Sequence, residues 1–333
     1  MQRQHYFDNL RAGLIYLVVL GHMFELVTSR ILDMAYVLVY LMHMPLFVFV
    51  SGYFAKYEPR KLLLGLIPMY FAFQLMYISF LRFGFGHGWL HIQFTTPHWI
   101  MWYLFALIFW TMLTPILEFC GKNRLSACVS VIAAFALALL AGFDNSIGYF
   151  VSLSRIFYFL PFFVMGYYAR MHCSDFPQLF TKWGVRFLFA ALSLGTAVLV
   201  YLYFERIDLR WFWGAFSYEA LSYTGYGVEI RALKYLFTVL LSIFALSFVP
   251  RNKLVLSYIG QRTLPVFLLH GFVVLLLREA NLMYFVPGGF VILGFVGVLS
   301  FVLVLVFSSG LFSYGLWCDI LRPKKNLRQE KNK

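Results

Sequence analysis

Ten long apolar segments follow one another along the sequence, and each has about the length that a helix needs to cross the roughly 30 Å hydrocarbon core of a membrane. They lie at about residues 10–28, 36–55, 62–82, 99–118, 125–142, 150–170, 186–204, 232–249, 262–278 and 289–317. The last is the longest, and we expect it to tilt or break near Ser308, Ser309 and Gly310. The pattern predicts an all-α integral membrane protein, a bundle of about ten transmembrane helices.

A shortage of charged residues supports this interpretation. Only 12% of the 333 residues are charged and 62% are hydrophobic, and the mean hydropathy is +0.78. A soluble domain has roughly a quarter of its residues charged, because its surface faces water. The composition therefore excludes a soluble enzyme, a secreted scaffold and a nucleic-acid-binding protein, so the net charge of +13 needs another explanation.

The positions of the basic residues supply that explanation. About two-thirds of the 27 lysines and arginines lie in the connections on the side of the two termini, and cytoplasmic loops carry such an excess. We therefore expect both termini in the cytoplasm, one transmembrane domain over residues 1–320 and a basic cytoplasmic tail over residues 321–333. The four cysteines are scattered without Cys-x-x-Cys spacing, so we expect neither a disulfide framework nor a metal site.

Polar residues inside the first apolar segment are candidates for function, because a charge at mid-bilayer costs about 2.5–3.5 kcal/mol on insertion scales. Arg11 lies at the cytoplasmic end of this segment and His22 follows eleven residues later, roughly 16 Å away on the same helix face. Glu25 follows after one more turn. We expect Glu25 either to hold and stabilise the imidazole of His22 or to form a structural ion pair with Arg155.

Other segments bring polar and aromatic residues to a depth similar to that of His22. They are His43 on the second segment, His98 and Trp102 at the outer end of the fourth, Arg155 on the sixth and His270 near the middle of the ninth. A single membrane histidine is usually a packing residue, but several at one depth favour a shared, hydrated cavity. A histidine in such a cavity can act as a base near neutral pH.

Two outer loops are rich in ring side chains, and their role is open at this stage. Aromatic residues at a membrane boundary are usually interfacial anchors, whereas a sugar-stacking platform is the sharper alternative. The first loop, residues 83–98, contains His87, Trp89, His91 and His98; the second, residues 205–231, contains Trp211, Trp213, Tyr218, Tyr223 and Tyr226.

Basic residues also cluster at the cytoplasmic mouths of the helices, among them Arg60, Lys61 and Lys122. Retention of positive charge in the cytoplasm explains most of them. Arg11 is the exception, because it lies within its apolar segment and on the face of His22, where a cation has no role in topology.

These residues form an ordered set of motifs that resembles the acyltransferase-3 family of membrane acyltransferases. Asp8-Asn9-Leu10-Arg11 followed by Val18-Val19-Leu20-Gly21-His22 resembles the opening helix of that family. Four further segments resemble its fucose-4-O-acetylase-like branch: His43 to Phe47 with Ser51-Gly52-Tyr53, Trp102-Tyr103-Leu104 with Trp110, Arg155 with Leu160 to Tyr167, and Leu264 to His270. The sequence departs from the family pattern in two places. Ala12 stands where the family usually has glycine, and Lys56, Arg60 and Lys61 stand where some members have an Arg-x-x-Arg pair.

The resemblance implies transfer of an acyl group, often acetyl, from cytoplasmic acyl-CoA to a carbohydrate hydroxyl, with no permanently bound cofactor. It implies that His22 is the catalytic base and Arg11 its required partner, with His43, Arg155 and His270 at recurrent polar positions. We expect Arg11, Arg60, Lys61 and Lys122 to bind the acyl-CoA phosphates, and His98, Trp102 and His270 to contact the acceptor. A lipid-linked glycan or nascent surface polysaccharide is the expected acceptor, in the cytoplasmic membrane of a bacterium.

A transporter or flippase for a glycan or small polar solute is the main alternative. Ten helices with polar residues near the midplane and with prolines such as Pro68, Pro161 and Pro265 are compatible with alternating access. Against this interpretation, the two halves of the chain contain no corresponding pair of Gly/Pro-interrupted segments. An enzyme would leave an acylated product and free CoA, whereas a carrier would leave its cargo unchanged.

Overall fold

The computed structural model describes residues 5–87, 96–148, 150–285 and 290–313, and every regular element in these ranges is helical. The α-helices are α1 (His5–Phe24), α2 (Arg30–Phe54), α3 (Pro59–Lys61), α4 (Ile67–Phe85), α5 (Trp102–Cys120), α6 (Arg124–Leu140), α7 (Leu153–His172), α8 (Trp183–Tyr203), α9 (Gly227–Phe248), α10 (Val255–Gly260), α11 (Thr263–Glu279), α12 (Phe290–Ser308) and α13 (Gly310–Ser313). A π-helical turn, Leu62–Leu66, joins α3 to α4, and short 3₁₀ turns precede α5 (Trp99–Met101) and α7 (Phe150–Ser152). Two more 3₁₀ turns, Phe204–Arg206 and η7 (Leu209–Trp213), follow α8.

Each of the ten predicted segments corresponds to a helix, so the predicted all-helical bundle is confirmed. Within the described residues, seven helices are long and apolar enough to cross a membrane by length and composition. They are Arg30–Phe54, Pro59–Phe85, Trp99–Cys120, Phe150–His172, Trp183–Arg206, Gly227–Phe248 and Phe290–Ser308. The remaining three predicted segments correspond to α1, to the shorter apolar helix α6 and to α11. The cytoplasmic placement of the termini stays a prediction, and the basic tail lies outside the described residues.

Several helix boundaries differ from those expected from hydropathy. Helix α1 ends at Phe24, so Glu25 lies in the turn that follows rather than within the helix. Helix α9 begins at Gly227, which places Arg231 inside a helix and not in the outer loop of residues 205–231 where we expected it. Lys234 lies in the same helix, within the predicted segment 232–249. Both cations are buried, because aromatic rings and backbone carbonyls of the loop cover them. The expected break near Ser309 is confirmed, since α12 ends at Ser308 and α13 begins at Gly310.

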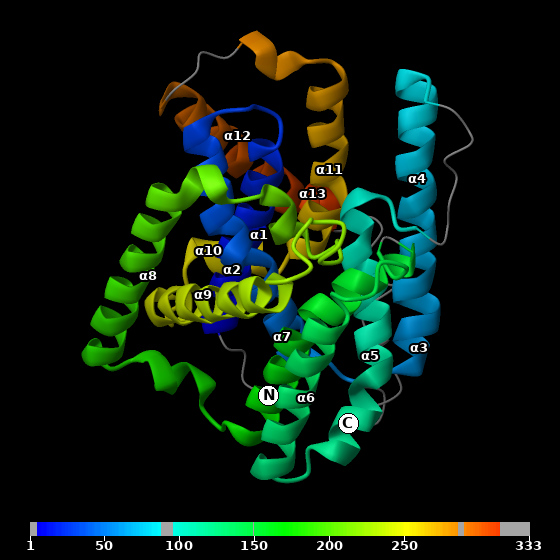
Figure 1. The fold of residues 1–333 in the computed structure, drawn as a ribbon. Helices are drawn as coiled ribbons and strands as arrows, with labels where there is room; N and C mark the ends of the chain where they lie inside the picture. Colours follow the sequence, from blue (N-terminus) through cyan, green and yellow to red (C-terminus); the bar gives the residue numbers. More distant parts are fainter. Residues whose placement is uncertain (1–4, 88–95, 149, 286–289, 314–333) are drawn as a thin grey trace, which may run out of the picture.

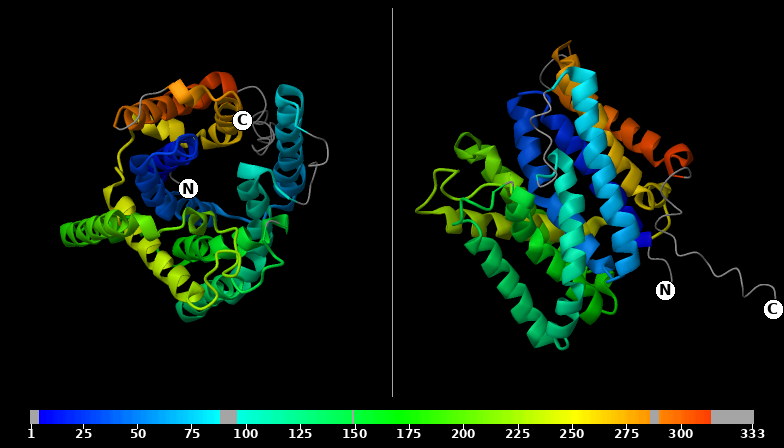
Figure 2. Two further views of the ribbon diagram at one scale, coloured as in Figure 1. Left: turned by 45° about the horizontal axis from the view of Figure 1, so that its top comes forward. Right: turned by 90° about the vertical axis from the view of Figure 1, so that its right-hand side faces the viewer.

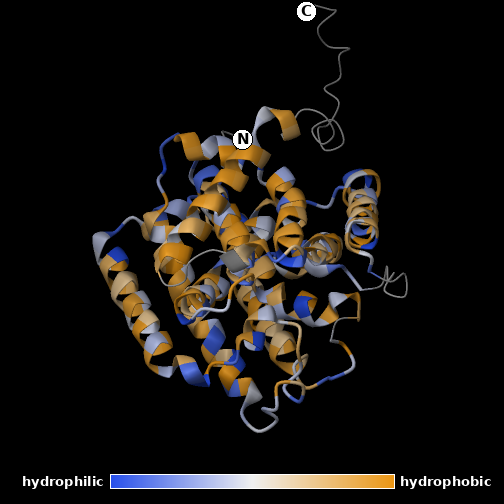
Figure 3. Ribbon diagram, turned by 90° about the horizontal axis from the view of Figure 1, so that it is seen from above, coloured by the Kyte–Doolittle hydropathy of each residue, from blue (hydrophilic) through white to orange (hydrophobic). Residues whose placement is uncertain are grey.

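Helices α1 and α2 form the centre of the molecule. Figure 1 shows α4 at one edge of the bundle and α8 at the opposite edge, with α1 and α2 between them, and Figure 2 shows the other helices arranged around this pair. The hydropathy colours of Figure 3 show predominantly hydrophobic helices at the periphery, where large apolar side chains such as Leu63, Leu194 and Val298 are exposed. Exposed apolar side chains of this kind suit a surface that faces the hydrocarbon of a membrane.

Two glycines bring α2 and α7 into close contact. A Cβ atom on Gly52 would overlap the backbone carbonyl of Phe163, and one on Gly166 would overlap the carbonyl of Phe49. The two helices therefore approach each other with almost no side chain between their backbones, as small residues permit in membrane helix pairs. This contact fixes His43 on α2 relative to Arg155 on α7.

We predict that Gly166→Ala lowers the thermal stability of the protein, because a methyl group has no space against the α2 backbone. Overpacking of this kind costs about 1–3 kcal/mol. The control is Gly195→Ala on α8, where a Cβ meets nothing within 4 Å and alanine favours the helix. The measurement is thermal unfolding in detergent; equal transition temperatures for the two variants would contradict the close α2–α7 contact.

Candidate functional site

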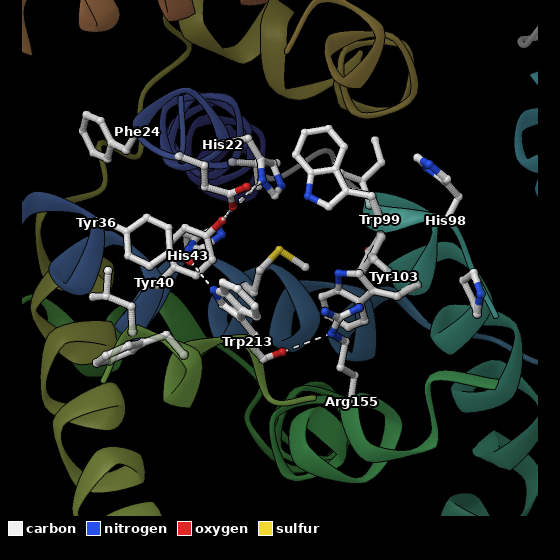
Figure 4. A pocket seen from close by; sticks show the side chains of 18 of the residues that line it. His22, Phe24, Tyr36, Tyr40, His43, His98, Trp99, Tyr103, Arg155 and Trp213 are labelled. Atoms are coloured by element: carbon white, nitrogen blue, oxygen red, sulfur yellow. Dashed lines mark hydrogen bonds and ion pairs between the residues drawn. The ribbon is translucent and has the colours of Figure 1, made fainter. Parts of the chain in front are cut away.

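A cavity of about 900 Å³ opens between the helices and is lined by residues of α1, α2, α4, α5, α7, α11 and the loop η7. Figure 4 shows side chains from these elements pointing into one space. The predicted site residues among its lining are His22, Glu25, His43, His98, Trp102 and Arg155. The predicted shared cavity is therefore present, and its size falls in the range of small-molecule pockets.

His22 and Glu25 are joined by a hydrogen bond at the wall of this cavity. The distance from His22 Nδ1 to Glu25 Oε1 is 3.1 Å. Because an ionised carboxylate only accepts hydrogen bonds, Nδ1 must carry the proton. The second ring nitrogen of neutral His22, Nε2, then has a lone pair that can accept a proton. This is the arrangement in which a carboxylate orients a histidine base.

Two more side chains complete the environment of Glu25. The hydroxyl of Tyr40 donates to Glu25 Oε1 over 2.5 Å, and the guanidinium of Arg278 lies 3.1 Å from Oε2. The carboxylate thus has partners on both oxygens, from α1, α2 and α11. We expected Glu25 either to hold His22 or to pair with Arg155, and the structure shows the contact with His22. The arginine that pairs with Glu25 is Arg278.

The hydroxyl of Tyr40 is held by aromatic packing with the outer loop. The ring of Tyr40 stacks on Tyr36, with centroids 3.7 Å apart, and the indole of Trp213 donates to the Tyr36 hydroxyl over 2.6 Å. The backbone carbonyl of Trp213 accepts from Arg155 Nε over 3.1 Å. Loop η7 therefore connects the Glu25 cluster with Arg155 across the cavity, as the dashed lines of Figure 4 show.

Arg155 lies in the first turn of α7, directly after a strained connection. Val151 and Ser152 both adopt left-handed backbone conformations, with φ of 52° and 51°, which non-glycine residues rarely adopt. The guanidinium of Arg155 lies 5.5 Å from the ring centroid of Trp102, within the range of a cation–π contact. Strained backbone of this kind is concentrated at functional sites.

His43 and His270 have the same hydrogen-bonding pattern. In each, Nδ1 bonds the backbone carbonyl four residues earlier, Val39 at 2.8 Å and Val266 at 2.9 Å. A carbonyl accepts, so Nδ1 carries the proton and neutral Nε2 can only accept. His43 lines the cavity. His270 is 0% exposed and stacks against His22, with ring centroids 5.5 Å apart, and it is not among the described residues that line the cavity.

Trp99 and His98 form the outer edge of the cavity. The ring of Trp99 meets His22 edge-on at 4.6 Å between centroids, and Arg278 lies over the opposite part of the indole at 5.2 Å. His98 stacks on Tyr77, with centroids 5.5 Å apart. Burial, with a further contribution from His87, lowers the pKa of His98 to about 4. His98 is therefore neutral at physiological pH.

The four predicted phosphate-binding cations lie apart from this cavity, and none of them is among the described residues that line it. Arg11 lies 3.5 Å from Asp8 and over the ring of Phe54 at 4.7 Å. Lys61 pairs with Glu58 at 2.6 Å, whereas Arg60 and Lys122 are exposed. The structure therefore brings together the histidines, Glu25, Trp102 and Arg155, but it does not bring these cations to them.

Sequence reasoning missed Tyr36, Tyr40, Trp99 and Arg278 as residues of the site. A signal for the two tyrosines was present, because Asp33, Tyr36, Tyr40 and His43 follow the three-to-four-residue spacing of one helix face and all line the cavity. Of the loop aromatics, Trp213 lines the cavity, whereas Trp211 and Tyr218 are buried. Trp89 and His91 lie outside the described residues.

Comparison with known proteins gives two similarities. The model of a family described as "Acyltransferase domain" matches residues 4–309. The chain is 30% identical over 183 residues to "Nodulation protein NolL" from Sinorhizobium fredii (strain NBRC 101917 / NGR234), a match that covers 48% of this chain. It covers 47% of NolL, so the chain spans about half the length of this curated relative. No solved structure matches.

We predict that Trp99→Gly is more stable than Trp99→Ala, although glycine is normally the less stable of the two. Trp99 has a φ of 34°, and a left-handed conformation costs a residue with a Cβ roughly 1–2 kcal/mol. Both variants lose the same ring, so thermal unfolding compares the backbone alone. The control pair is Met101→Gly and Met101→Ala, at a φ of −66°, where alanine should be more stable. Alanine being preferred at both positions would contradict the strain at Trp99.

Proposed function

Because this chain belongs to the acyltransferase family whose domain model matches residues 4–309, we propose that it transfers an acetyl group from cytoplasmic acetyl-CoA to a hydroxyl of a carbohydrate or lipid-linked glycan. The family match confirms the resemblance that the sequence motifs indicated. Together with the seven candidate membrane spans, it makes the chain a membrane O-acyltransferase. The acetyl donor, the glycan acceptor and the residue roles below are our proposals.

The observation that carries the proposal is the hydrogen bond between Glu25 and His22 Nδ1 at the cavity wall. His22 Nε2 removes the proton of the acceptor hydroxyl as its oxygen attacks the thioester carbonyl. The carbon–sulfur bond then breaks, and the protonated His22 returns the proton to the departing thiolate of CoA. Glu25 keeps the imidazole in the required tautomer and stabilises its charged form. General base catalysis of this kind typically contributes 10²–10⁴-fold.

Stabilisation of the developing oxyanion is assigned to Arg155. An oxyanion needs a hydrogen-bond donor or a positive charge, and Arg155 lines the cavity. His43 also lines the cavity, but its Nδ1 proton is donated to the carbonyl of Val39. Neutral His43 therefore offers only a lone pair at Nε2, which suits it to accept a hydrogen bond from an acceptor hydroxyl.

The acetyl donor is proposed to approach from the side of Arg11, with Arg60, Lys61 and Lys122 as further contacts for its phosphates. Arg and Lys are the usual partners of phosphate groups in proteins. Arg11 and His22 share helix α1, and eleven residues of rise separate them by roughly 16 Å. The slim pantetheine arm would have to bridge this distance between the helices to bring the thioester to His22.

The acceptor is proposed to bind on the opposite side, among the aromatic rings of the cavity. Trp102 lines the cavity, but its ring is stacked on Phe159 and contacts the guanidinium of Arg155. Trp99 and Trp213 offer indole rings there, and His98 lies at the edge. Sugar rings pack well on such faces, because one side of a pyranose is largely apolar. His270, which we expected at the acceptor, is instead assigned to the support of His22 from behind.

We predict that His22→Ala abolishes acetyl transfer, with a loss of about 10²–10⁴-fold. The assay supplies purified protein with labelled acetyl-CoA and a panel of glycans, and measures both labelled glycan and free CoA thiol. His172→Ala is the control, because His172 bonds the carbonyl of Gly121 and does not line the cavity. Full transfer by His22→Ala would remove His22 from the mechanism. An unmodified glycan carried across a membrane would indicate a transporter.

We also predict that Tyr40→Phe lowers kcat by about 10- to 100-fold and leaves the KM for acetyl-CoA unchanged. The substitution keeps the ring and removes the hydroxyl, which donates to Glu25 and lies 3.3 Å from His22 Nδ1, and hydrogen bonds to charged groups contribute about 1.5–3 kcal/mol. Tyr16→Phe on α1 is the control, because its hydroxyl bonds the carbonyl of Gly297 away from the cavity. An unchanged kcat in Tyr40→Phe would exclude a role for this hydroxyl.

A further inference from the structure

Two cations lie buried side by side on α9, under the outer loop that carries Trp213. Arg231 is 2% exposed and Lys234 is 7% exposed. They are three residues apart, so they share a helix face, where two like charges repel each other. The mechanism proposed above uses neither.

Arg231 joins three separate parts of the chain. Its NH1 group donates to the carbonyl of Ala138 near the end of α6, and its NH2 group donates to the carbonyl of Phe216, each at 3.0 Å. The guanidinium also lies over the ring of Tyr218, 4.5 Å from its centroid. A cation at the last carbonyls of a helix is favourable, so Arg231 fastens residues 216–218 to the end of α6.

Lys234 fastens the neighbouring part of the same loop. Its ammonium group donates to the backbone carbonyl of Trp211 and lies over the rings of Phe212 and Tyr158, 4.5 and 4.8 Å from their centroids. Tyr158 belongs to α7, one turn after Arg155. Lys234 therefore holds loop η7 against both α9 and α7.

Within the described part of the chain, neither cation forms an ion pair with a carboxylate; the partners of both are carbonyl oxygens and aromatic faces. Burial of a charge without a counter-charge is unfavourable in protein and in membrane. Carbonyl acceptors and cation–π contacts recover only a part of this cost. The Trp211 carbonyl and the rings of Phe212 and Tyr158 are therefore the contacts that hold the Lys234 side chain.

The residues that Lys234 holds are the ones that shape the acceptor side of the cavity. Phe212 and Trp213, directly after Trp211, both line it. Trp213 accepts from Arg155 through its carbonyl and donates to Tyr36 through its indole. A shift of the Trp211 carbonyl would therefore move Trp213 and both of its partners.

We propose that Lys234, assisted by Arg231, is a positioning residue that fixes loop η7 and thereby the acceptor-binding wall of the cavity. The kinetic part of this inference rests on the proposed acetyl transfer. The structural part concerns the loop alone and holds whatever the reaction is. The donor side, around Arg11, is independent of this loop.

The experiment compares Lys234→Met, which keeps the length of the side chain without its charge, with Lys234→Arg, which keeps a cation. The control is Arg206→Met, because Arg206 is exposed in the same outer loop. Hydrogen exchange of loop residues 205–226 is measured by mass spectrometry in the purified full-length protein, together with the Tm. The KM values for the glycan acceptor and for acetyl-CoA are measured in parallel.

In Lys234→Met, the proposal expects faster hydrogen exchange of the loop and an increase of about tenfold or more in the KM for the acceptor. The KM for acetyl-CoA should be unchanged, and Tm should stay within about 4 °C of the parent protein. Lys234→Arg should restore slow exchange and acceptor KM, and Arg206→Met should change neither. Unchanged exchange in Lys234→Met overturns the proposal, as does a loss of Tm with equal effects on both substrates. If the parent protein transfers no acetyl group, the proposed function fails and hydrogen exchange alone decides this inference.

Discussion

The rest of the site depends on the hydrogen bonds that the carboxylate of Glu25 accepts. Its two oxygens accept from His22, Tyr40 and Arg278 on α1, α2 and α11. Each partner is a donor, so the protein itself solvates the half-buried carboxylate. One charge thereby selects the tautomer of the base and fixes three helices relative to one another.

The remaining polar groups of the cavity are fixed mainly by backbone carbonyls. His43 and His270 each give their Nδ1 proton to the carbonyl one turn earlier, and Arg155 gives its Nε proton to loop η7. In a membrane interior a side chain without a partner is costly, and a local carbonyl is the nearest partner. The consequence is chemical as well as structural, because the bond at His43 leaves Nε2 as the ring nitrogen that can accept a hydrogen bond in the cavity.

The helices could be predicted from the sequence because membrane spans have a characteristic length and composition. The histidines, Glu25 and Arg155 could be predicted as site residues because polar residues are rare within such spans. Tyr36 and Tyr40 share a helix face with His43, which is a signal for them, whereas Trp99 could not be singled out, since the sequence is rich in aromatic residues that serve as packing. Arg231 was assigned to a loop because hydropathy ends a helix at its charges, and nothing in the sequence showed that Arg231 and Lys234 would both be buried. Only the tertiary structure shows the rings and carbonyls that make such charges tolerable.

Helix α1 is anchored at both ends, and this links the two sides of the proposed reaction. At its start, the side-chain amide of Asn9 donates to the carbonyls of Pro250 and Asn252 and accepts from Ser257. At its end, Glu25 is held by Arg278. A helix fixed only at its start could change its tilt, and His22 would then move away from the cavity while Arg11 kept its position. Because both ends are fixed, Arg11 and His22 stay on the same face of one rigid helix.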